Sequence, residues 1–208
     1  MTPDPTRPLR DALREAYHNH AEQREASETQ DWKTRERGAF LDLLKHEHKA
    51  SLLEIGAGVG HDSLFFQDQS LAVTAIDLTP AMVALCRQKG LKAYVMDMTD
   101  LCLPDESFDA VYALNSLLHL PKAEFPLALS EIWRVLRPGG LAFIGVYGGY
   151  DFEGIWDSDP YVPQRFFSFF TDERIEQEVS KLFAVVSFNR VYFGPEDPIH
   201  FQALTLRK

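Results

Sequence analysis

The sequence contains few cysteines and no long apolar run. Two cysteines among 208 residues, not arranged as C-x-x-C, cannot build a disulfide framework, and we expect both thiols to be buried. The longest apolar run starts at Leu141 and is interrupted by Gly145, well short of the roughly 20 residues that cross a bilayer. These two deficits exclude a disulfide-rich secreted domain and predict that the chain does not enter a membrane.

Basic residues are also in deficit. The chain carries 21 Lys and Arg against 31 Asp and Glu, a formal charge of −10, which should repel a polyanion. Its first residues lack the basic and then apolar layout of a secretory signal, which predicts a cytoplasmic protein. With 45% hydrophobic residues, the chain can bury the core of one medium-sized domain. We therefore expect small, neutral or cationic partners and no nucleic acid.

Residues 1–50 have no strand-like run and are rich in good helix formers. One helix should start near Pro8, with Leu9, Leu13 and Tyr17 on its inner face, and a second should span about 32–48. Four histidines in this part superficially resemble metal spacing, but their charged, helical surroundings favour solvated faces. We predict that residues 1–50 form an N-terminal helical cap.

Residues 51–208 alternate short apolar runs with helical segments. Five runs of strand length alternate with helices, which indicates a parallel sheet covered on both faces; they span 52–55, 71–76, 93–96, 108–114 and 141–146. The runs 185–193 and 199–206 are joined by a loop over 194–198 that is too short for a parallel crossover, so they should form an antiparallel hairpin. The predicted fold is therefore α/β, doubly wound, with a mostly parallel seven-stranded sheet.

A glycine-rich loop joins the first strand to the first following helix. Gly56, Gly58 and Gly60 stand at alternate positions, which permits a tight turn and brings bare backbone next to a helix N-terminus. The dinucleotide-binding fingerprint has the spacing G-x-G-x-x-G, and its third glycine position is taken here by His61. The loop predicts a nucleotide-like ligand but disfavours a nicotinamide cofactor.

Three acids lie at or near the carboxyl ends of consecutive strands. Asp77, 21 residues after Gly56, could accept hydrogen bonds from both hydroxyls of a ribose, although it could also only cap the next helix. Asp97 could receive an exocyclic amine, and Glu54 needs a partner because it lies inside an apolar strand. Each acid alone is more often structural, but together they favour a ligand site in the crevice where open α/β sheets bind ligands.

At these residues the sequence resembles the class I S-adenosylmethionine-dependent methyltransferases, which have a Rossmann-like fold. The resemblance covers about residues 50–208. Five blocks carry it: the E-x-G-x-G-x-G loop (54–60), the acid Asp77, the segment 96–98, the strand-four block 108–119 and the segment 136–140. The resemblance implies a sheet of seven strands that ends in a hairpin, which agrees with the layout above.

The resemblance also implies a cofactor and its contacts. Glu54 and the backbone of Gly56, Ala57, Gly58 and Gly60 would hold the methionine end of S-adenosyl-L-methionine, the cofactor released as S-adenosyl-L-homocysteine. Asp77 would bind the ribose and Asp97 the adenine amine. Leu78 and Met98 would enclose the adenine ring, and Asn115 would face the ammonium.

A sulfonium already activates the methyl group, so the reaction needs an aligned, dry nucleophile and in principle no metal. His119 is the candidate general base, because it follows strand four on the side where an acceptor should approach, although it could only bond backbone. Candidate acceptor contacts are Tyr147, Tyr150, Trp156 and Arg165, with packing or a rim position as the alternative. Tyr17 is the aromatic residue of the helical lid expected to reach the cofactor.

We expect a monomeric or homodimeric methyltransferase that acts on an oxygen, nitrogen or carboxylate of a small molecule. An RNA or protein methyltransferase is the first alternative. It is disfavoured because residues 115–118 are not N-P-P-Y and because no basic patch is present. A non-catalytic S-adenosylmethionine-binding module would keep the same residues, and an NAD-dependent oxidoreductase is disfavoured by His61.

Overall fold

A computed structural model of the chain describes residues 5–27, 29–194 and 197–208. The strands of this part are β1 (Ser51–Ile55), β2 (Ala72–Asp77), β3 (Lys92–Val95), β4 (Phe108–Leu114), β5 (Leu136–Gly148), β6 (Phe152–Ile155), β7 (Phe166–Phe169), β8 (Ala184–Tyr192) and β9 (His200–Arg207). The helices are α1 (Arg7–Asn19), α2 (Ala21–Glu25), α3 (Asp31–His46), α4 (His61–Asp68), α5 (Pro80–Gln88), the short 3-10 helix η1 (Leu117–His119), α6 (Phe125–Val135) and α7 (Asp172–Val179).

Seven strands form one sheet in the order β3-β2-β1-β4-β5-β9-β8. The pairs among β1 to β5 are parallel, and β9 runs antiparallel to both β5 and β8. This confirms the predicted doubly wound sheet with an antiparallel pair at its end. Of the expected hairpin loop, residues 195 and 196 lie outside the described residues.

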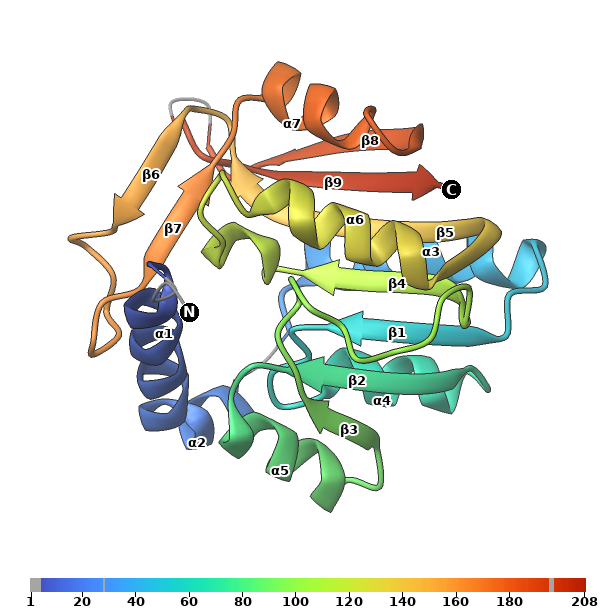
Figure 1. Cartoon of the computed structure of the whole chain (residues 1–208), viewed down its shortest axis with the longest axis horizontal. Coiled ribbons are helices and arrows are strands. Elements are labelled where there is room, and N and C mark those ends of the chain that lie inside the picture. The colour runs from blue at the N-terminus through green and yellow to red at the C-terminus, as the bar shows by residue number, and fades with distance from the viewer. Residues whose placement is uncertain (1–4, 28, 195–196) are drawn as a thin grey trace.

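The strand order creates a crevice between β1 and β4. The chain proceeds from β1 outward to β3 and then returns to place β4 on the other side of β1, so that Leu53 pairs with Thr74 of β2 and with Val111 of β4. Connections leaving β1 and β4 diverge at this reversal, which is where open α/β sheets bind ligands. Figure 1 shows α1 and α2 beside the carboxyl ends of these strands.

Alternate residues of the central strands supply two cores. Leu53 and Val111 belong to a buried cluster that includes residues of α6, whereas Leu52 and Tyr112 belong to another that includes residues of α3 and α4. This is the period of two of a strand buried on both faces. Accordingly α6 covers one face of the sheet in Figure 1, and α3 and α4 cover the other.

The predicted division of the chain at residue 50 stays a prediction. Phe40, Leu41 and Leu44 of α3 are buried in the same cluster as Leu52 of β1, so α3 is part of the layer that covers the sheet. The helices α1 and α2, which form the lid, lie beside the carboxyl ends of the strands (Figure 1).

A second, two-stranded sheet formed by β6 and β7 was not predicted. Its strands pair antiparallel over four residues each. Phe167 and Phe169 of β7 are buried and pack in the main core. Phe167 and Phe169 also line the cavity at the carboxyl ends of the central strands, and Figure 1 shows β7 beside α1.

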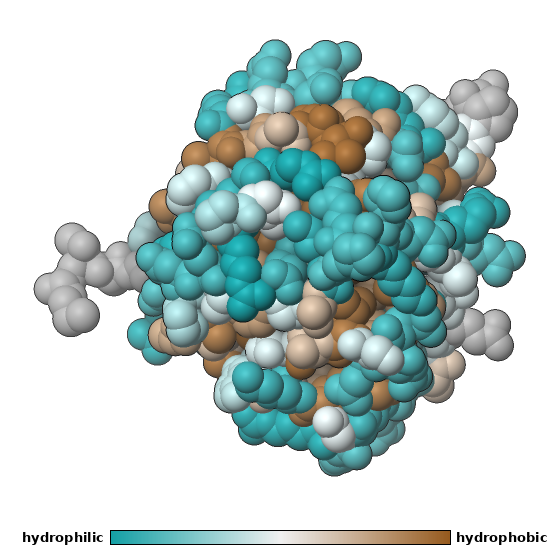
Figure 2. Space-filling view, turned by 90° about the vertical axis from the view of Figure 1, so that its right-hand side faces the viewer, coloured by the Kyte–Doolittle hydropathy of each residue, from teal (hydrophilic) through white to brown (hydrophobic). Residues whose placement is uncertain are grey.

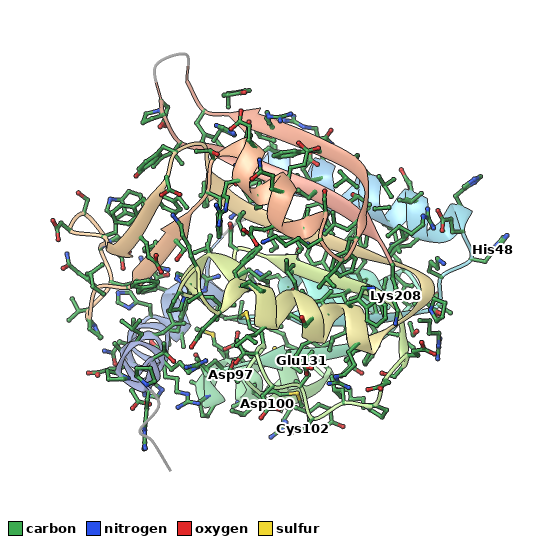
Figure 3. All side chains as sticks on the ribbon, turned by 45° about the horizontal axis from the view of Figure 1, so that its top comes forward. His48, Asp97, Asp100, Cys102, Glu131 and Lys208 are labelled. Atoms are coloured by element: carbon green, nitrogen blue, oxygen red, sulfur yellow. The ribbon has the colours of Figure 1, made fainter. Side chains whose placement is uncertain are left out.

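The two cysteines differ in environment. Cys86 is buried in α5, and burial raises the pKa of its thiol to about 12. Cys102 is exposed, so the prediction of two buried thiols is wrong for this residue; it lies in the segment between β3 and β4, near Asp100 and Glu131 (Figure 3). No helix in the described part is both long and apolar enough to cross a membrane. The end of the molecule opposite the lid is largely hydrophilic, with separate apolar areas (Figure 2).

Candidate active site

A cavity of about 520 Å³ lies at the carboxyl ends of β1, β2 and β4, below the lid. Eleven of the predicted site residues line it: Tyr17, Gly56, Gly58, Asp77, Leu78, Met98, Asn115, His119, Tyr147, Trp156 and Arg165. Side chains from elements far apart in the sequence thus meet in one place. Five predicted residues lie outside its walls: Glu54, Ala57, Gly60, Asp97 and Tyr150.

The glycine loop turns back along the end of β2. The N–H groups of Gly56 and Ala57 donate to the carbonyl of Ile76 at 2.9 and 3.0 Å. Gly56 has φ +74°, and a Cβ there would lie 2.3 Å from Cβ of Ser116, so no other residue fits without a shift. The close approach of Gly56 to Ser116 joins the loop after β1 to the loop after β4 at the floor of the cavity.

Asp77 holds the glycine loop and still faces the cavity. Its Oδ2 accepts the N–H of Gly58 at 2.8 Å, and its Oδ1 accepts the N–H of Thr79 at 2.7 Å. Burial raises the pKa of this carboxyl, and the two backbone donors oppose the rise. Each carboxylate oxygen has a second lone pair, so the group can accept further hydrogen bonds from a ligand in the cavity.

Glu54 and Gly60 lie beneath the loop. Glu54 is 3% exposed and accepts a hydrogen bond from Oγ of Ser63; burial, together with the nearby negative charge of Asp62, raises the pKa of its carboxyl well above the usual range. A Cβ on Gly60 would meet Cys86 and Leu91, so this glycine faces α5 and not the cavity. Their contacts with a cofactor stay predictions.

Two polar side chains at the end of β4 are buried without a partner among the described residues. They are Oδ1 of Asn115 and Oγ of Ser116, and both residues line the cavity. Asn115 has φ +54°, and its N–H donates to the carbonyl of Gly145 at 2.7 Å, which fixes this turn. Buried polar atoms are rarely left unpaired in proteins, so these two are suited to bind a ligand that carries hydrogen-bond donors.

Asp97 is engaged by the lid. Its Oδ2 accepts Nε of Arg10 from α1 at 2.6 Å, and its Oδ1 accepts the backbone N–H and the hydroxyl of Thr99. Figure 3 shows Asp97 on the side of the molecule where α1 runs. It shares a small adjoining cavity of about 40 Å³ with Leu78 and Met98, room for a water but not for a purine. The predicted adenine contacts are thus neighbours, but α1 closes over them.

His119 and Tyr17 meet across the cavity. Nδ1 of His119 lies 2.9 Å from the carbonyl oxygen of Phe166, and Nε2 lies 2.8 Å from Oη of Tyr17. A carbonyl only accepts, so Nδ1 carries the proton, Nε2 is the free base and the phenol donates to it. Burial lowers the pKa of His119 to about 3, which keeps the ring neutral. The pKa of Tyr17 is raised by burial, although Arg165 and Arg24 oppose the rise.

The positive charge of Arg165 is neutralised by an ion pair with Asp159. Its Nε and Nη2 donate to the two oxygens of Asp159 at 2.9 and 2.6 Å, and the Asp159 side chain is only 1% exposed. Nη1 donates to Oη of Tyr17 at 3.1 Å. The predicted acceptor contact at Arg165 stays a prediction, while the geometry shows that this guanidinium positions the phenol of Tyr17.

Of the other three predicted acceptor residues, two line the cavity and one does not. Tyr147 and Trp156 line the cavity, and burial raises the pKa of Tyr147. Trp156 packs edge-on against Phe167 and Phe169, with ring centroids 5.4 and 5.8 Å apart. Tyr150 instead packs on Phe152 and Phe169, outside the cavity walls.

Sequence reasoning missed two cations in the cavity, Arg24 of α2 and Lys33 of α3. Nη2 of Arg24 lies 3.6 Å from the position that a Cβ would take on Gly58, directly over the glycine loop. Nothing in the local sequence distinguishes these two from the other basic residues of the N-terminal helices. In the described ranges, no group of three or more His, Cys, Asp or Glu side chains is arranged to hold a metal ion.

Matches to known proteins are found at the level of sequence. Residues 53–144 match the family model described as a methyltransferase domain. Malonyl-(acyl-carrier protein) O-methyltransferase from Serratia marcescens is 35% identical over 92 residues, which cover 43% of this chain and 35% of that protein. The chain thus spans about a third of the length of this curated relative.

Two solved structures share the fold. A 1,6-didemethyltoxoflavin-N1-methyltransferase from Burkholderia thailandensis, with bound 1,6-didemethyltoxoflavin and S-adenosylhomocysteine, superposes with a TM-score of 0.75 at 23% identity, over 100% of this chain and 92% of that one. The [4+2]-cyclase SpnF superposes with a TM-score of 0.63 at 22% identity, over 76% and 74% of the two chains. At such identities the likeness shows the fold alone.

Proposed function

We propose that the chain is a class I S-adenosylmethionine-dependent methyltransferase, since residues 53–144 match the family model described as a methyltransferase domain, and that it transfers the methyl group of S-adenosyl-L-methionine to a small-molecule oxygen, nitrogen or carboxylate. The transfer takes place by in-line displacement in the cavity below the lid. The observation that carries the proposal is the set of unpartnered buried groups at Asn115, Ser116 and Arg24, which open on the same cavity as Asp77.

These groups fit the methionine end of the cofactor. Oδ1 of Asn115 and Oγ of Ser116 are acceptors for an ammonium, and the guanidinium of Arg24 over Gly58 is a donor for a carboxylate. Asp77 is placed to accept the ribose hydroxyls, and Leu78 and Met98 to contact the adenine. When bound, the cofactor supplies a methyl group that its sulfonium already activates.

The residues of the cavity would align the acceptor and exclude water. Tyr147, Trp156, Tyr161 and Phe167 present aromatic surface to the cavity. Displacement at a methyl carbon requires mainly that the attacking atom be held about 3–3.5 Å away and in line, in a dry site. An enclosing lid of α1 and α2 supplies the exclusion of water.

The proton of an O–H or N–H acceptor leaves through Tyr17 and His119 in this proposal. The acceptor gives its proton to Oη of Tyr17 as the phenol proton passes to Nε2 of His119, 2.8 Å away. The carbonyl of Phe166 holds Nδ1–H and so orients the ring, while Nη1 of Arg165 donates to the phenol oxygen and holds it in position. A carboxylate acceptor needs no such relay, because it is already deprotonated.

Calorimetric titration followed by a turnover assay tests the proposal. S-adenosyl-L-homocysteine and S-adenosyl-L-methionine should bind with micromolar affinity and NAD should not. Turnover should then appear as release of S-adenosyl-L-homocysteine when small-molecule acceptors are supplied. Binding of NAD in place of the two nucleosides contradicts the proposal, and binding of both nucleosides without turnover over a broad acceptor panel would favour a non-catalytic binding module.

A further inference from the structure

Lys33 and Arg24 reach the cavity as cations without a counter-ion. No carboxylate of the described residues lies within 4.0 Å of either side chain. Nε of Arg24 is buried and has no hydrogen-bond partner among the described residues, while Nη1 lies 3.4 Å from the hydroxyl of Tyr161. Nζ of Lys33 lies 5.3 Å from the ring centroid of Trp32, and no hydrogen bond joins it to a residue in the described ranges.

Desolvation makes these charges costly. Burial lowers the pKa of Lys33, and the charge of Arg24 lowers it further. An unpaired charge away from water is unfavourable unless a partner meets it. The two cations are therefore suited to bind an anionic ligand, because no carboxylate of the described residues pairs with them.

Two carboxylates of the described residues line the cavity, those of Asp77 and Asp197, and each already accepts hydrogen bonds from the backbone. Asp77 accepts two backbone N–H groups, and Oδ1 of Asp197 accepts the N–H of Ile199. Asp159 accepts hydrogen bonds from the guanidinium of Arg165 on both of its carboxylate oxygens. The lining carboxylates of Asp77 and Asp197, with Asp159 behind Arg165, equal in number the three cations Arg24, Lys33 and Arg165, so the charges of these residues sum to zero, although of these cations only Arg165 forms an ion pair among the described residues.

A bound cofactor shifts this balance. S-adenosyl-L-methionine has an ammonium, a sulfonium and one carboxylate, which is one net positive charge. Its carboxylate can satisfy only one of the two free cations, and Arg24 lies over the glycine loop where the methionine end is proposed to bind. Lys33 is then left without a counter-charge in a cavity that has become positive.

The surface around Lys33 is aromatic. Tyr147 and Phe193 line the cavity with ring centroids 5.7 Å apart, and both contact Trp32, the neighbour of Lys33 in α3. Flat aromatic walls bind planar, apolar bodies well, while the few polar groups of a pocket set orientation. The cation thus stands at the edge of an apolar compartment.

From this juxtaposition we propose that the methyl acceptor is a planar small molecule that bears an oxyanion, and that Lys33 binds this oxyanion. The inference rests on the proposed function and deepens it, because it names the substrate class of the same cavity. It makes Lys33 a specificity-determining residue that acts on the acceptor and not on the cofactor.

Matched pairs of probes test the inference. Hydroxybenzoates and hydroxynaphthoates, each compared with its own carboxamide, are titrated into the protein saturated with S-adenosyl-L-homocysteine. The acids should bind at least tenfold more tightly than the amides. Lys33→Gln should abolish this preference and Lys33→Arg should keep it, whereas Lys45→Gln, at an exposed position of the same helix, should behave as the wild-type protein.

The order of measurements separates the two proposals. Failure of S-adenosyl-L-homocysteine to bind overturns the proposed function itself. If it binds, equal affinity for acids and amides, or no binding of any acid at millimolar concentration, overturns only the acceptor class. A Lys33→Gln protein that loses S-adenosyl-L-homocysteine affinity as strongly as acid affinity would assign Lys33 to the cofactor and would also overturn the inference.

Discussion

Oη of Tyr17 lies 2.8 Å from Nε2 of His119, although 102 residues separate the two in sequence. One residue comes from the lid and the other from the loop after β4, so their contact forms only when α1 lies over the strand ends. The carbonyl of Phe166 fixes the tautomer of His119, and Arg165 fixes the phenol. The two side chains act as one unit in the proposed proton transfer.

Tyr17→Phe should lower kcat for a hydroxyl or amine acceptor by about 100-fold, within the range of a lost general base. S-adenosyl-L-homocysteine affinity should change by less than about threefold, because the variant keeps the ring. Tyr192→Phe, at an exposed tyrosine of β8, is the matched control. Steady-state kinetics with parallel calorimetry separate the outcomes. A loss of cofactor affinity with unchanged kcat would make Tyr17 a cofactor contact, as the sequence suggested.

His119 should make stability fall in acid. Its pKa is about 3 in the folded protein and ordinarily 6.5, so the unfolded chain binds the proton first as the pH falls. The stabilisation is complete above pH 6.5 and is lost toward pH 3 at about 1.4 kcal/mol per pH unit. Between pH 6.5 and 5, the wild-type protein should lose about 2 kcal/mol more than His119→Gln in urea denaturation. His46→Gln, at an exposed histidine, should follow the wild type; parallel curves for all three proteins would refute the shift.

Asp77→Ala should weaken S-adenosyl-L-homocysteine binding by about 1–3 kcal/mol, through lost charged hydrogen bonds to the ribose and a loosened glycine loop. Asp68→Ala, at the exposed end of α4, tests for general charge effects and should leave affinity unchanged. Calorimetry measures both variants. Affinity retained in a folded Asp77→Ala protein would remove the ribose assignment.

Arg10→Ala should release α1. The substitution removes an ion pair to Asp97 at 2.6 Å and another to Glu124 at 3.0 Å, both half-buried, and charged hydrogen bonds of this type contribute about 1.5–3 kcal/mol. Amide hydrogens of α1 should therefore exchange faster while those of β1 and β4 do not change. Arg7→Ala breaks an exposed pair with Asp11 in the same helix and should have little effect. Unchanged exchange of α1 in Arg10→Ala would show that other contacts hold the lid.

Gly56→Ala should destabilise the fold by more than about 1–2 kcal/mol, the cost of the left-handed conformation alone, because the new Cβ also meets Ser116. Gly38→Ala is the converse control. Gly38 lies inside α3 with nothing within 4 Å of the new Cβ, so this variant should gain about 0.5–1 kcal/mol. Urea denaturation compares the two, and equal stabilities would contradict the close approach of the two loops.

The sequence by itself determined the sheet. Runs such as 52–55 and 108–114 are apolar at every position but one, Glu54 and Asp109 respectively, because both faces of a parallel strand are buried, and this pattern can be recognised in the sequence alone. The glycine spacing after β1 and the acid Asp77 also indicated where the crevice lies. Both are local patterns, because a tight turn and a strand end each restrict which residues can occupy the position. The small sheet of β6 and β7 was not predicted, because strands of four residues are too short to show a recognisable alternation of apolar and polar residues.

Only the tertiary structure decided what each charged or aromatic side chain does in the site. Arg165, Arg24 and Lys33 look alike in sequence, yet Asp159 neutralises the first, while no carboxylate in the described part of the chain pairs with the other two. Asp97 pairs with Arg10 of the lid, and the carbonyl oxygen of Phe166 fixes the tautomer of His119. Ion pairs and hydrogen bonds depend on distances of a few ångströms between residues far apart in the chain, and local sequence patterns do not encode such distances.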